Sequence, residues 1–170
     1  MNYELRTMNM TQTGIGFDLH RLVTGRPLIL GGVRIPFRKG LKGHSDADVL
    51  VHAICDALLG AIGDNDMGEH FPDTDPKFKN ISSLRLLKEV LDRVTRKGFS
   101  LVHLDTIVIA QKPKLSPFKE SIRSRLAEAL SVAENQVNVK AKTTEGLGLF
   151  GRSEGIASYA IATVERKGHR

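Results

Sequence analysis

The chain has 170 residues, of which 41% are hydrophobic and 26% are charged, and this composition is typical of one globular domain that forms its core without disulfides. The only cysteine, Cys55, lies in an apolar run, which excludes an internal disulfide framework and favours a buried thiol in a reducing compartment. The net charge of +6 suits either an anionic ligand or a solvated basic surface, but no aromatic residues alternate with basic ones, which argues against nucleic-acid binding.

Neither a membrane helix nor a targeting sequence is expected. No segment approaches the ~20 apolar residues that span a bilayer, and the first ten residues, MNYELRTMNM, lack the apolar core of a signal peptide. We therefore expect a cytoplasmic protein with no membrane partner. Its predicted organisation is a flexible extension over residues 1–10 and a single domain over residues 11–170.

The first half of the chain predicts a strand, a hairpin and a helix. Residues 12–20 alternate in polarity as a strand does, and residues 28–37 form two short apolar runs around a Gly-Gly pair, which is typical of a hairpin. Ser45 is a suitable N-cap for a helix that continues to about Ala61. Residues 64–80 are rich in Asp, Pro, Gly and Asn and are expected to form a loop.

The second half predicts two more helices and three more strands. Ser82 or Ser83 begins a helix that ends at Lys97-Gly98. The remaining elements are expected at 100–110 (strand), 116–130 (helix), 136–142 (strand) and 155–164 (strand). This order, with a split βαβ unit, predicts an α+β fold with one layer of helices on one face of a mixed four-stranded sheet, a small extra hairpin and a ferredoxin-like arrangement. The uncovered sheet face is expected to pack against further copies of the chain.

The first candidate for chemistry is Asp18-x-His20. Residues two apart on a strand point to the same face, so a carboxylate and an imidazole would project together near the end of the strand. Taken alone, this pair is more typical of the polar face of an ordinary strand edge than of a metal site.

The helix that follows adds a stripe of His and Asp. His44, Asp48, His52 and Asp56 recur at intervals of four residues, and no Lys or Arg occurs between residues 43 and 60. Such a stripe is often only the wet face of a helix, but its composition suits a metal site. His52 would then complete a set of three N/O ligands with a fourth position open, as in catalytic zinc sites. Asp48 or Asp56, one turn away, would orient the imidazole.

Two loops offer groups for a phosphate-containing ligand. Residues 65–76 gather carboxylates that would bind Mg²⁺ or sugar hydroxyls, although Asp-Thr-Asp-Pro is also a good turn by itself. In residues 140–155, Thr143, Thr144 and Glu145 offer hydroxyls, backbone N–H groups and a magnesium ligand, and Lys142 and Arg152 offer phosphate contacts. The second loop is not a P-loop, and by itself it is also compatible with a plain strand-end loop.

Together these segments resemble the 2-C-methyl-D-erythritol 2,4-cyclodiphosphate synthase family of the non-mevalonate isoprenoid pathway. The resemblance runs from about Thr13 to Val164 and depends on GFDLH, LILGGVRIP, HSDADVLVHAICDALLGA, MGEHFPDTDP, AQKPKLSP, and VKAKTTEGLG followed by GRSEGI. It implies a lyase that closes 4-diphosphocytidyl-2-C-methyl-D-erythritol 2-phosphate into the cyclic diphosphate and releases CMP. It also implies a homotrimer in which each site lies between subunits.

The resemblance further implies a role for each matching residue. It assigns Zn²⁺ or a similar divalent metal to Asp18, His20 and His52, and Mg²⁺ or Mn²⁺ to Glu145. It assigns support of the transition state to His44 and Thr143. Contacts with the CDP-linked substrate are assigned to Ser45, Asp66, Gly68, Phe71, Asp73, Ala110, Pro113, Lys114, Leu115, Ser116, Lys142, Thr144 and Arg152. Two other classes remain open from the residues themselves. One is a zinc-dependent phosphohydrolase that uses water as nucleophile, and the other is a non-catalytic nucleic-acid binder.

Overall fold

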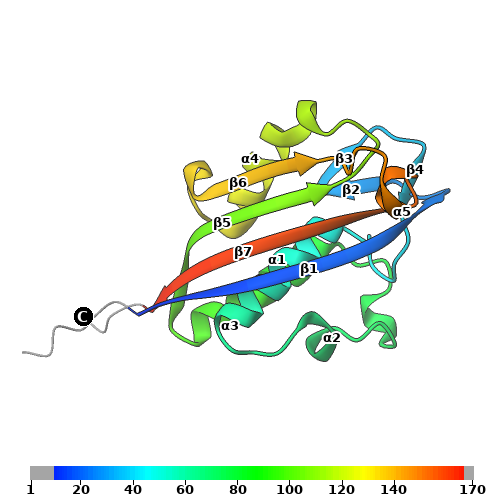
Figure 1. Cartoon of the computed structure of the whole chain (residues 1–170). Helices are drawn as coiled ribbons and strands as arrows, with labels where there is room; N and C mark the ends of the chain where they lie inside the picture. Colours follow the sequence, from blue (N-terminus) through cyan, green and yellow to red (C-terminus); the bar gives the residue numbers. More distant parts are fainter. Residues whose placement is uncertain (1–9, 167–170) are drawn as a thin grey trace, which may run out of the picture.

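A mixed five-stranded sheet forms the centre of the computed structural model, which describes residues 10–166 (Figure 1). The sheet has the order β4-β1-β7-β5-β6. Its strands are β1 (Thr11–Thr24), β4 (Lys39–Leu41), β5 (Phe99–Ile109), β6 (Val137–Lys142) and β7 (Gly155–Arg166), and a separate hairpin is formed by β2 (Leu28–Leu30) and β3 (Val33–Ile35). The predicted extension at residues 1–10 lies, except for its last residue, outside the described part of the chain.

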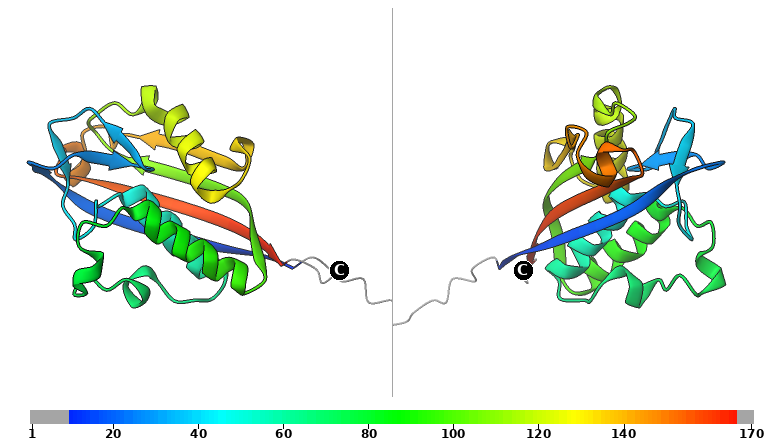
Figure 2. Two further views of the ribbon diagram at one scale, coloured as in Figure 1. Left: turned by 180° about the vertical axis from the view of Figure 1, so that it is seen from behind. Right: turned by 45° about the vertical axis from the view of Figure 1, so that its right-hand side comes forward.

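Three longer helices and several short ones connect the strands. They are α1 (Val49–Ala61), α2 (Met67–His70), α3 (Ser83–Arg96), α4 (Lys119–Leu130) and α5 (Gly148–Gly151), with 3-10 turns at Pro76–Phe78, Ser116–Phe118 and Glu134–Gln136. Figure 2 shows α1, α3 and α4 together on one face of the sheet, which confirms the predicted α+β class with a single helix layer. Among the described residues, no helix is both long and apolar enough to cross a membrane.

Three details of the predicted sheet are wrong. It has five strands because β1 continues to Thr24, and its last residues pair with Lys39–Leu41 as an extra edge strand. The βαβ unit is not split, since β5 and β6 pair directly and in parallel. The larger elements follow one another as β1, α1, α3, β5, α4, β6 and β7, which is not the β-α-β-β-α-β order of a ferredoxin-like fold.

Two glycines allow α1 to lie very close to β1. A Cβ atom added to Gly14 would stand 2.1 Å from the Ala57 carbonyl oxygen, and one added to Gly16 would stand 1.9 Å from the Ala53 carbonyl oxygen. Only residues without a side chain fit at this distance. The helix therefore crosses the strand almost at backbone contact, next to the position where β1 carries Asp18.

The helix α1 begins at Val49, three residues later than a cap at Ser45 would place its start. Its cap is Asp48, whose Oδ1 accepts a hydrogen bond from the Val51 amide at 3.2 Å. The same carboxylate accepts hydrogen bonds from the Gly31 and Gly32 amides, at 2.9 and 2.7 Å, in the turn of the β2-β3 hairpin. One buried side chain thus caps the helix and holds the hairpin turn against it.

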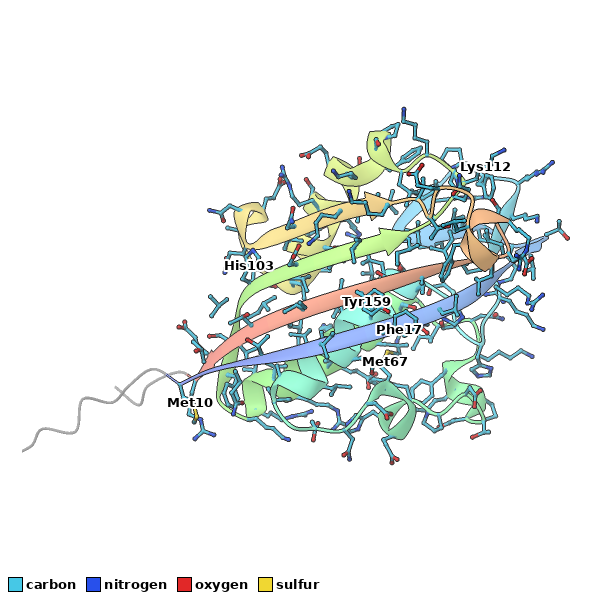
Figure 3. All side chains as sticks on the ribbon, in the orientation of Figure 1. Met10, Phe17, Met67, His103, Lys112 and Tyr159 are labelled. Carbon is cyan, nitrogen blue, oxygen red and sulfur yellow. The ribbon has the colours of Figure 1, made fainter. Side chains whose placement is uncertain are left out.

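The face of the sheet opposite the helices carries exposed apolar side chains. On β1 and β7 these are Ile15, Phe17, Leu19, Tyr159 and Ile161, each at least 40% exposed. The rings of Phe17 and Tyr159 lie side by side with centroids 4.6 Å apart, and Figure 3 shows both on the uncovered face. This is the sheet face that we expect from the sequence to be uncovered by helices and to pack against further copies of the chain.

Candidate active site

Asp18, His20 and His52 meet where β1 passes over α1. Asp18 and His20 point to the helix side of β1, and His52 projects toward them from the first turn of α1. Asp18 Oδ2 lies 2.8 Å from His20 Nε2 and 2.9 Å from His52 Nδ1, and the two nitrogens are 3.1 Å apart. The structure therefore brings together the three residues that the sequence suggests as metal ligands.

The donor atoms of this cluster fit a divalent metal. Two imidazole nitrogens and one carboxylate oxygen are common zinc ligands, and catalytic zinc keeps three protein ligands with one position open. Around a tetrahedral zinc with bonds of about 2.0–2.1 Å, ligand atoms stand about 3.3–3.4 Å apart. The observed separations of 2.8–3.1 Å need to grow by only a few tenths of an ångström to admit the ion.

Electrostatic interactions in the cluster favour a negative charge on Asp18 and a positive charge on His52. Burial alone would raise the pKa of the Asp18 carboxyl, but hydrogen bonds and charge from His20 and His52 hold this pKa well below its usual range. Burial likewise lowers the pKa of His52, but the hydrogen bond and charge of Asp18 outweigh it and raise the pKa. A metal binds the neutral imidazole, so the raised pKa of His52 makes metal binding more sensitive to a fall in pH.

The other ring nitrogen of His52 contacts two serines. His52 Nε2 lies 2.8 Å from Ser83 Oγ, on the first residue of α3, and 3.2 Å from Ser45 Oγ. Ser83 in turn forms hydrogen bonds to the Asp46 carboxylate through its amide, at 3.0 Å, and through its hydroxyl. The imidazole of His52 is thus fixed on both sides.

The predicted orienting carboxylates have other hydrogen-bond partners. Burial raises the pKa of Asp48 to about 6, and its oxygens accept from the backbone of the hairpin and of α1. Asp56 lines the cavity beside the cluster, and its Oδ1 accepts from the Met67 amide at 2.8 Å. Neither carboxylate contacts His52 Nε2, whose hydrogen-bond partners are Ser45 and Ser83.

A cavity of about 690 Å³ lies in front of the cluster. Ligand pockets commonly measure about 300–1,000 Å³, so this one admits a small phosphorylated molecule. Its predicted lining residues are Asp18, His20, His44, Ser45, His52, Asp56, Gly68, Phe71 and Asp73. Asp66, which was also predicted there, instead caps α2, where its Oδ1 accepts from the Glu69 amide at 3.2 Å.

The loop with His44 and Ser45 is fixed from outside the cavity. The Arg26 guanidinium donates to the backbone carbonyls of Gly43 and Ser45, at 2.9 and 2.6 Å. His44 Nε2 lies 3.2 Å from the carbonyl oxygen of Asp75, in the loop across the cavity. These contacts join the two walls between which a substrate would lie.

The remaining predicted residues form a second group at the ends of β5 and β6. The loop after β5 contains Ala110, Pro113, Lys114, Leu115 and Ser116, and the loop after β6 contains Lys142, Thr143, Thr144, Glu145 and, further on, Arg152. The two loops lie side by side, because the Ala110 amide donates to the Lys142 carbonyl at 2.9 Å and the Gly146 amide donates to Gln111 Oε1 at 3.3 Å.

This second group is mostly exposed, and none of its residues lines the cavity of the metal cluster. Thr143 Oγ1 donates to Glu145 Oε1 at 2.9 Å, and Thr144 Oγ1 donates to the Leu147 carbonyl at 2.7 Å. Arg152 pairs with Glu154. Within one chain the predicted site is therefore divided into a metal half and a loop half.

Three residues that organise the metal half are not among the predicted site residues. They are Arg26, Asp46 and Ser83. Arg26 and Ser83 contact the cavity residues Ser45 and His52, and Asp46 acts one step further away, through Ser83. The sequence predicts Ser83 only as a possible start of a helix, and it predicts no role for Asp46 in the site. Their joint role depends on a contact between positions 37 residues apart, for which the local sequence has no signal.

Comparison with known proteins identifies the family. The YgbB family model matches residues 11–165. The chain is 58% identical over 157 residues to the 2-C-methyl-D-erythritol 2,4-cyclodiphosphate synthase of Pelotomaculum thermopropionicum, covering 92% of this chain and 97% of that protein. The identity to the Bacillus subtilis enzyme of the same name is 55%, and the match covers 92% of this chain and 99% of that protein.

Solved structures agree with this result. The bifunctional IspDF of Campylobacter jejuni matches with a TM-score of 0.91 and 48% identity, covering 94% of this chain and 43% of that longer one. The IspF of Plasmodium falciparum, in a CDP complex, matches with a TM-score of 0.83 and 32% identity, and the match covers 95% of this chain and 100% of that one. The resemblance drawn from the sequence is confirmed, and the chain belongs to the YgbB family, whose members among these relatives are 2-C-methyl-D-erythritol 2,4-cyclodiphosphate synthases.

Proposed function

We propose that the chain is a CMP-releasing lyase that converts 4-diphosphocytidyl-2-C-methyl-D-erythritol 2-phosphate to 2-C-methyl-D-erythritol 2,4-cyclodiphosphate, in the non-mevalonate pathway to isoprenoids. The observation that carries this proposal is the cluster of Asp18, His20 and His52 at the cavity of about 690 Å³, in a chain 58% identical to a synthase of that name. The cytoplasmic location expected from the sequence stays a prediction.

The proposed reaction is an internal phosphoryl transfer. An oxygen of the 2-phosphate forms a bond to the β-phosphorus, and the bond from that phosphorus to the oxygen bridging to the α-phosphate breaks. CMP leaves with the electron pair. Because the nucleophile is already an anion, no strong base is required, and the barrier consists of charge repulsion and geometry. Holding both phosphates in one cavity is the main contribution, since well-oriented intramolecular reactions gain on the order of 7–11 kcal/mol.

Residues of the metal half hold the reacting phosphates. Asp18, His20 and His52 would bind Zn²⁺ or a similar divalent ion, which supplies Lewis-acid stabilisation of phosphate charge when bound. His44 and Ser45 line the same cavity and would donate hydrogen bonds to the phosphate of the erythritol unit. Gly68, Phe71 and Asp73 form the wall where the erythritol carbons and hydroxyls would lie.

Residues of the loop half would bind the nucleotide. In the loop after β5, Lys114 is exposed and would contact the phosphates, while backbone groups of the same loop would contact the cytidine. Glu145 would hold Mg²⁺ or Mn²⁺ on the diphosphate, and the neighbouring Thr143 would support the transition state. The relative from Plasmodium falciparum is described as a CDP complex, which supports a CDP-linked substrate.

A complete site requires two copies of the chain in this proposal, because the loop half does not line the cavity of the metal half. We propose a homotrimer, in which each metal half faces the loop half of a neighbour. The exposed apolar face around Phe17 and Tyr159 supports association, since apolar patches of this kind are usually covered in an assembly.

The experiment that tests the activity is turnover of the CDP-linked substrate with and without a chelator. Phosphorus NMR should show the cyclic diphosphate and CMP, and the chelator should stop their formation. A linear phosphorylated product would instead support the phosphohydrolase, in which water is the nucleophile. Retention of oligonucleotides without any turnover would contradict both enzymatic alternatives.

The shared site is tested separately by mixing two inactive variants. His52→Ala removes a metal ligand and Glu145→Gln alters the loop half, so each homotrimer should have little activity. In randomly mixed trimers, about a quarter of the sites would combine an intact metal half with an intact loop half, and activity should recover to that extent. No recovery in mixed trimers would show that each site is formed within one chain.

A further inference from the structure

Ser83 and Asp46 form a continuous hydrogen-bonded chain to the metal ligand His52. Ser83 is completely buried at the start of α3, with its Oγ 2.8 Å from His52 Nε2. The hydroxyl and the amide of Ser83 both donate to the Asp46 carboxylate. Asp46 is fixed in turn, since its Oδ1 accepts from the Asp48 amide at 3.2 Å and its own amide donates to the Ile81 carbonyl at 3.0 Å.

The direction of these bonds determines which nitrogen of His52 carries a proton. A carboxylate oxygen only accepts, so the single hydroxyl proton of Ser83 is given to Asp46. Ser83 Oγ then has only lone pairs to offer, and its contact with His52 Nε2 requires that this nitrogen be the donor. A neutral imidazole with a proton on Nε2 has its free lone pair on Nδ1.

The lone pair of Nδ1 is directed at the metal position. His52 Nδ1 is the atom that lies 2.9 Å from Asp18 Oδ2 and 3.1 Å from His20 Nε2. Metal-binding histidines generally donate their second N–H to a carboxylate or carbonyl group, which fixes the tautomer and the ring orientation. Here a buried serine hydroxyl stands between the imidazole and the carboxylate.

We infer that Ser83 and Asp46 are positioning residues that hold His52 in the Nε2–H tautomer and so present Nδ1 to the metal. This inference rests on the proposed function only for the presence of the metal. It also has a consequence for Ser45. Because His52 Nε2 has a proton and no free lone pair in this tautomer, the Ser45 hydroxyl 3.2 Å away cannot donate to it and directs its own proton into the cavity, toward a phosphate oxygen.

A purely structural role is the main alternative, because Asp46 also accepts the Ser83 amide at the first turn of α3. Ser83→Ala separates the two roles, since it removes only the hydroxyl and keeps the amide that bonds to Asp46. Ser82→Ala is the matched control, because the neighbouring Ser82 is exposed and its side chain makes no capping hydrogen bond.

The test measures zinc affinity and the His52 tautomer in the protein without substrate. Competition with a chromophoric chelator should show about a 10- to 100-fold weaker affinity in Ser83→Ala, the range found for such supporting partners, and no change in Ser82→Ala. Unfolding of the metal-free variants in urea should show that Ser83→Ala still folds.

Long-range ¹H–¹⁵N NMR of the zinc-loaded protein gives the decisive readout. The inference requires His52 with a proton on Nε2 and zinc on Nδ1, which can be observed in the unmutated chain even if Ser83→Ala fails to fold. Zinc on Nε2, or a Ser83→Ala affinity within twofold of the parent, would overturn it. No CDP-linked substrate enters these measurements, so failure of the proposed reaction would leave their outcome unchanged.

Discussion

Substituting alanine for Gly16 should damage both the fold and the metal site. The added Cβ would stand 1.9 Å from the Ala53 carbonyl oxygen, whereas real Cβ atoms essentially never approach closer than 3.0 Å. The atom that it meets belongs to the backbone of α1, so no side-chain rotation relieves the contact. Strand β1 and helix α1 must therefore separate by at least about 1.1 Å at this point.

That separation falls between the elements that carry the proposed metal ligands. Asp18 lies two residues after Gly16 on β1, and His52 directly precedes Ala53 on α1. If the displacement is transmitted to the ligands, Asp18 Oδ2 and His52 Nδ1 move from 2.9 Å to about 4.0 Å apart, beyond the roughly 3.4 Å of a tetrahedral zinc site. We expect a loss of about 3 kcal/mol in unfolding free energy, the upper end for overpacked cores, and at least about tenfold weaker zinc binding.

Urea unfolding of the metal-free protein measures the first effect, and chelator competition measures the second. All variants are compared at one protein concentration, because association stabilises the folded chain. Gly60→Ala is the matched control on α1, since its Cβ would meet nothing closer than 3.8 Å. Replacing a helical glycine should stabilise it by about 0.5–1 kcal/mol. A Gly16→Ala variant that unfolds within about 0.5 kcal/mol of the parent and keeps its zinc would refute this account of the interface.

Four other outcomes are expected. Asp48→Ala removes the cap of α1 and leaves the amides of Gly31 and Gly32 without their acceptor, so urea unfolding should show a loss of about 3–5 kcal/mol; a loss below about 1 kcal/mol would contradict it. Burial raises the pKa of Asp48 to about 6, so between about pH 4 and 6 the folded state binds a proton that the unfolded chain has released, and the free energy of unfolding falls as the pH rises. Asp48→Asn cannot lose this proton, so its free energy of unfolding should rise by up to about 3 kcal/mol relative to the parent across this window. Parallel pH profiles of the two proteins would contradict the raised pKa. His52→Ala should lose zinc, measured by elemental analysis, and keep its fold; unchanged zinc content would mean that the ligand is wrongly assigned. Glu145→Gln should lower turnover far more than zinc content, and full activity would remove magnesium binding from its role.

The positions of most elements could be predicted from local sequence because each has a strong pattern and a clear stop. The helix expected after Ser82 or Ser83 begins at Ser83 and ends just before Lys97-Gly98, as predicted. The strand at 99–109 and the hairpin around Gly31-Gly32 also lie within a residue or two of their expected ranges. These elements combine hydrophobic periodicity with glycine or serine at their ends, and both signals are local.

Sheet topology was less predictable because strand pairing depends on distant contacts. The short strand Lys39–Leu41 has no alternating pattern of its own, and it becomes a strand only because the end of β1 extends past the sheet and pairs with it. The direct pairing of β5 with β6 likewise follows from the path of β7 between β1 and β5. Neither arrangement has a signature within a window of ten or twenty residues.

The meeting of Asp18, His20 and His52, the proposed metal ligands, was predictable for a different reason. Asp18 and His20 share a strand face by simple alternation, and His52 lies among residues of the kind that bind metals. Their meeting required only that the helix after the hairpin pack on the first strand. The partners of His52 were not predictable in this way, since Ser83 reaches it from another helix, 31 residues away.

The Asp and His residues at positions 44, 48, 52 and 56 serve mainly to hold neighbouring segments in the structure, and not to form one metal site. Of these residues, only His52 belongs to the proposed metal cluster, while Asp48 and Asp56 accept hydrogen bonds from backbone amides of other segments. Asp46, just before the helix, does the same for the first amide of α3. The acidic residues thus fix the hairpin, α2 and α3 around one helix, and two of these segments form walls of the cavity. Long, mobile Lys and Glu side chains would not hold backbone amides at these distances, which explains their absence between residues 43 and 60 better than metal binding alone.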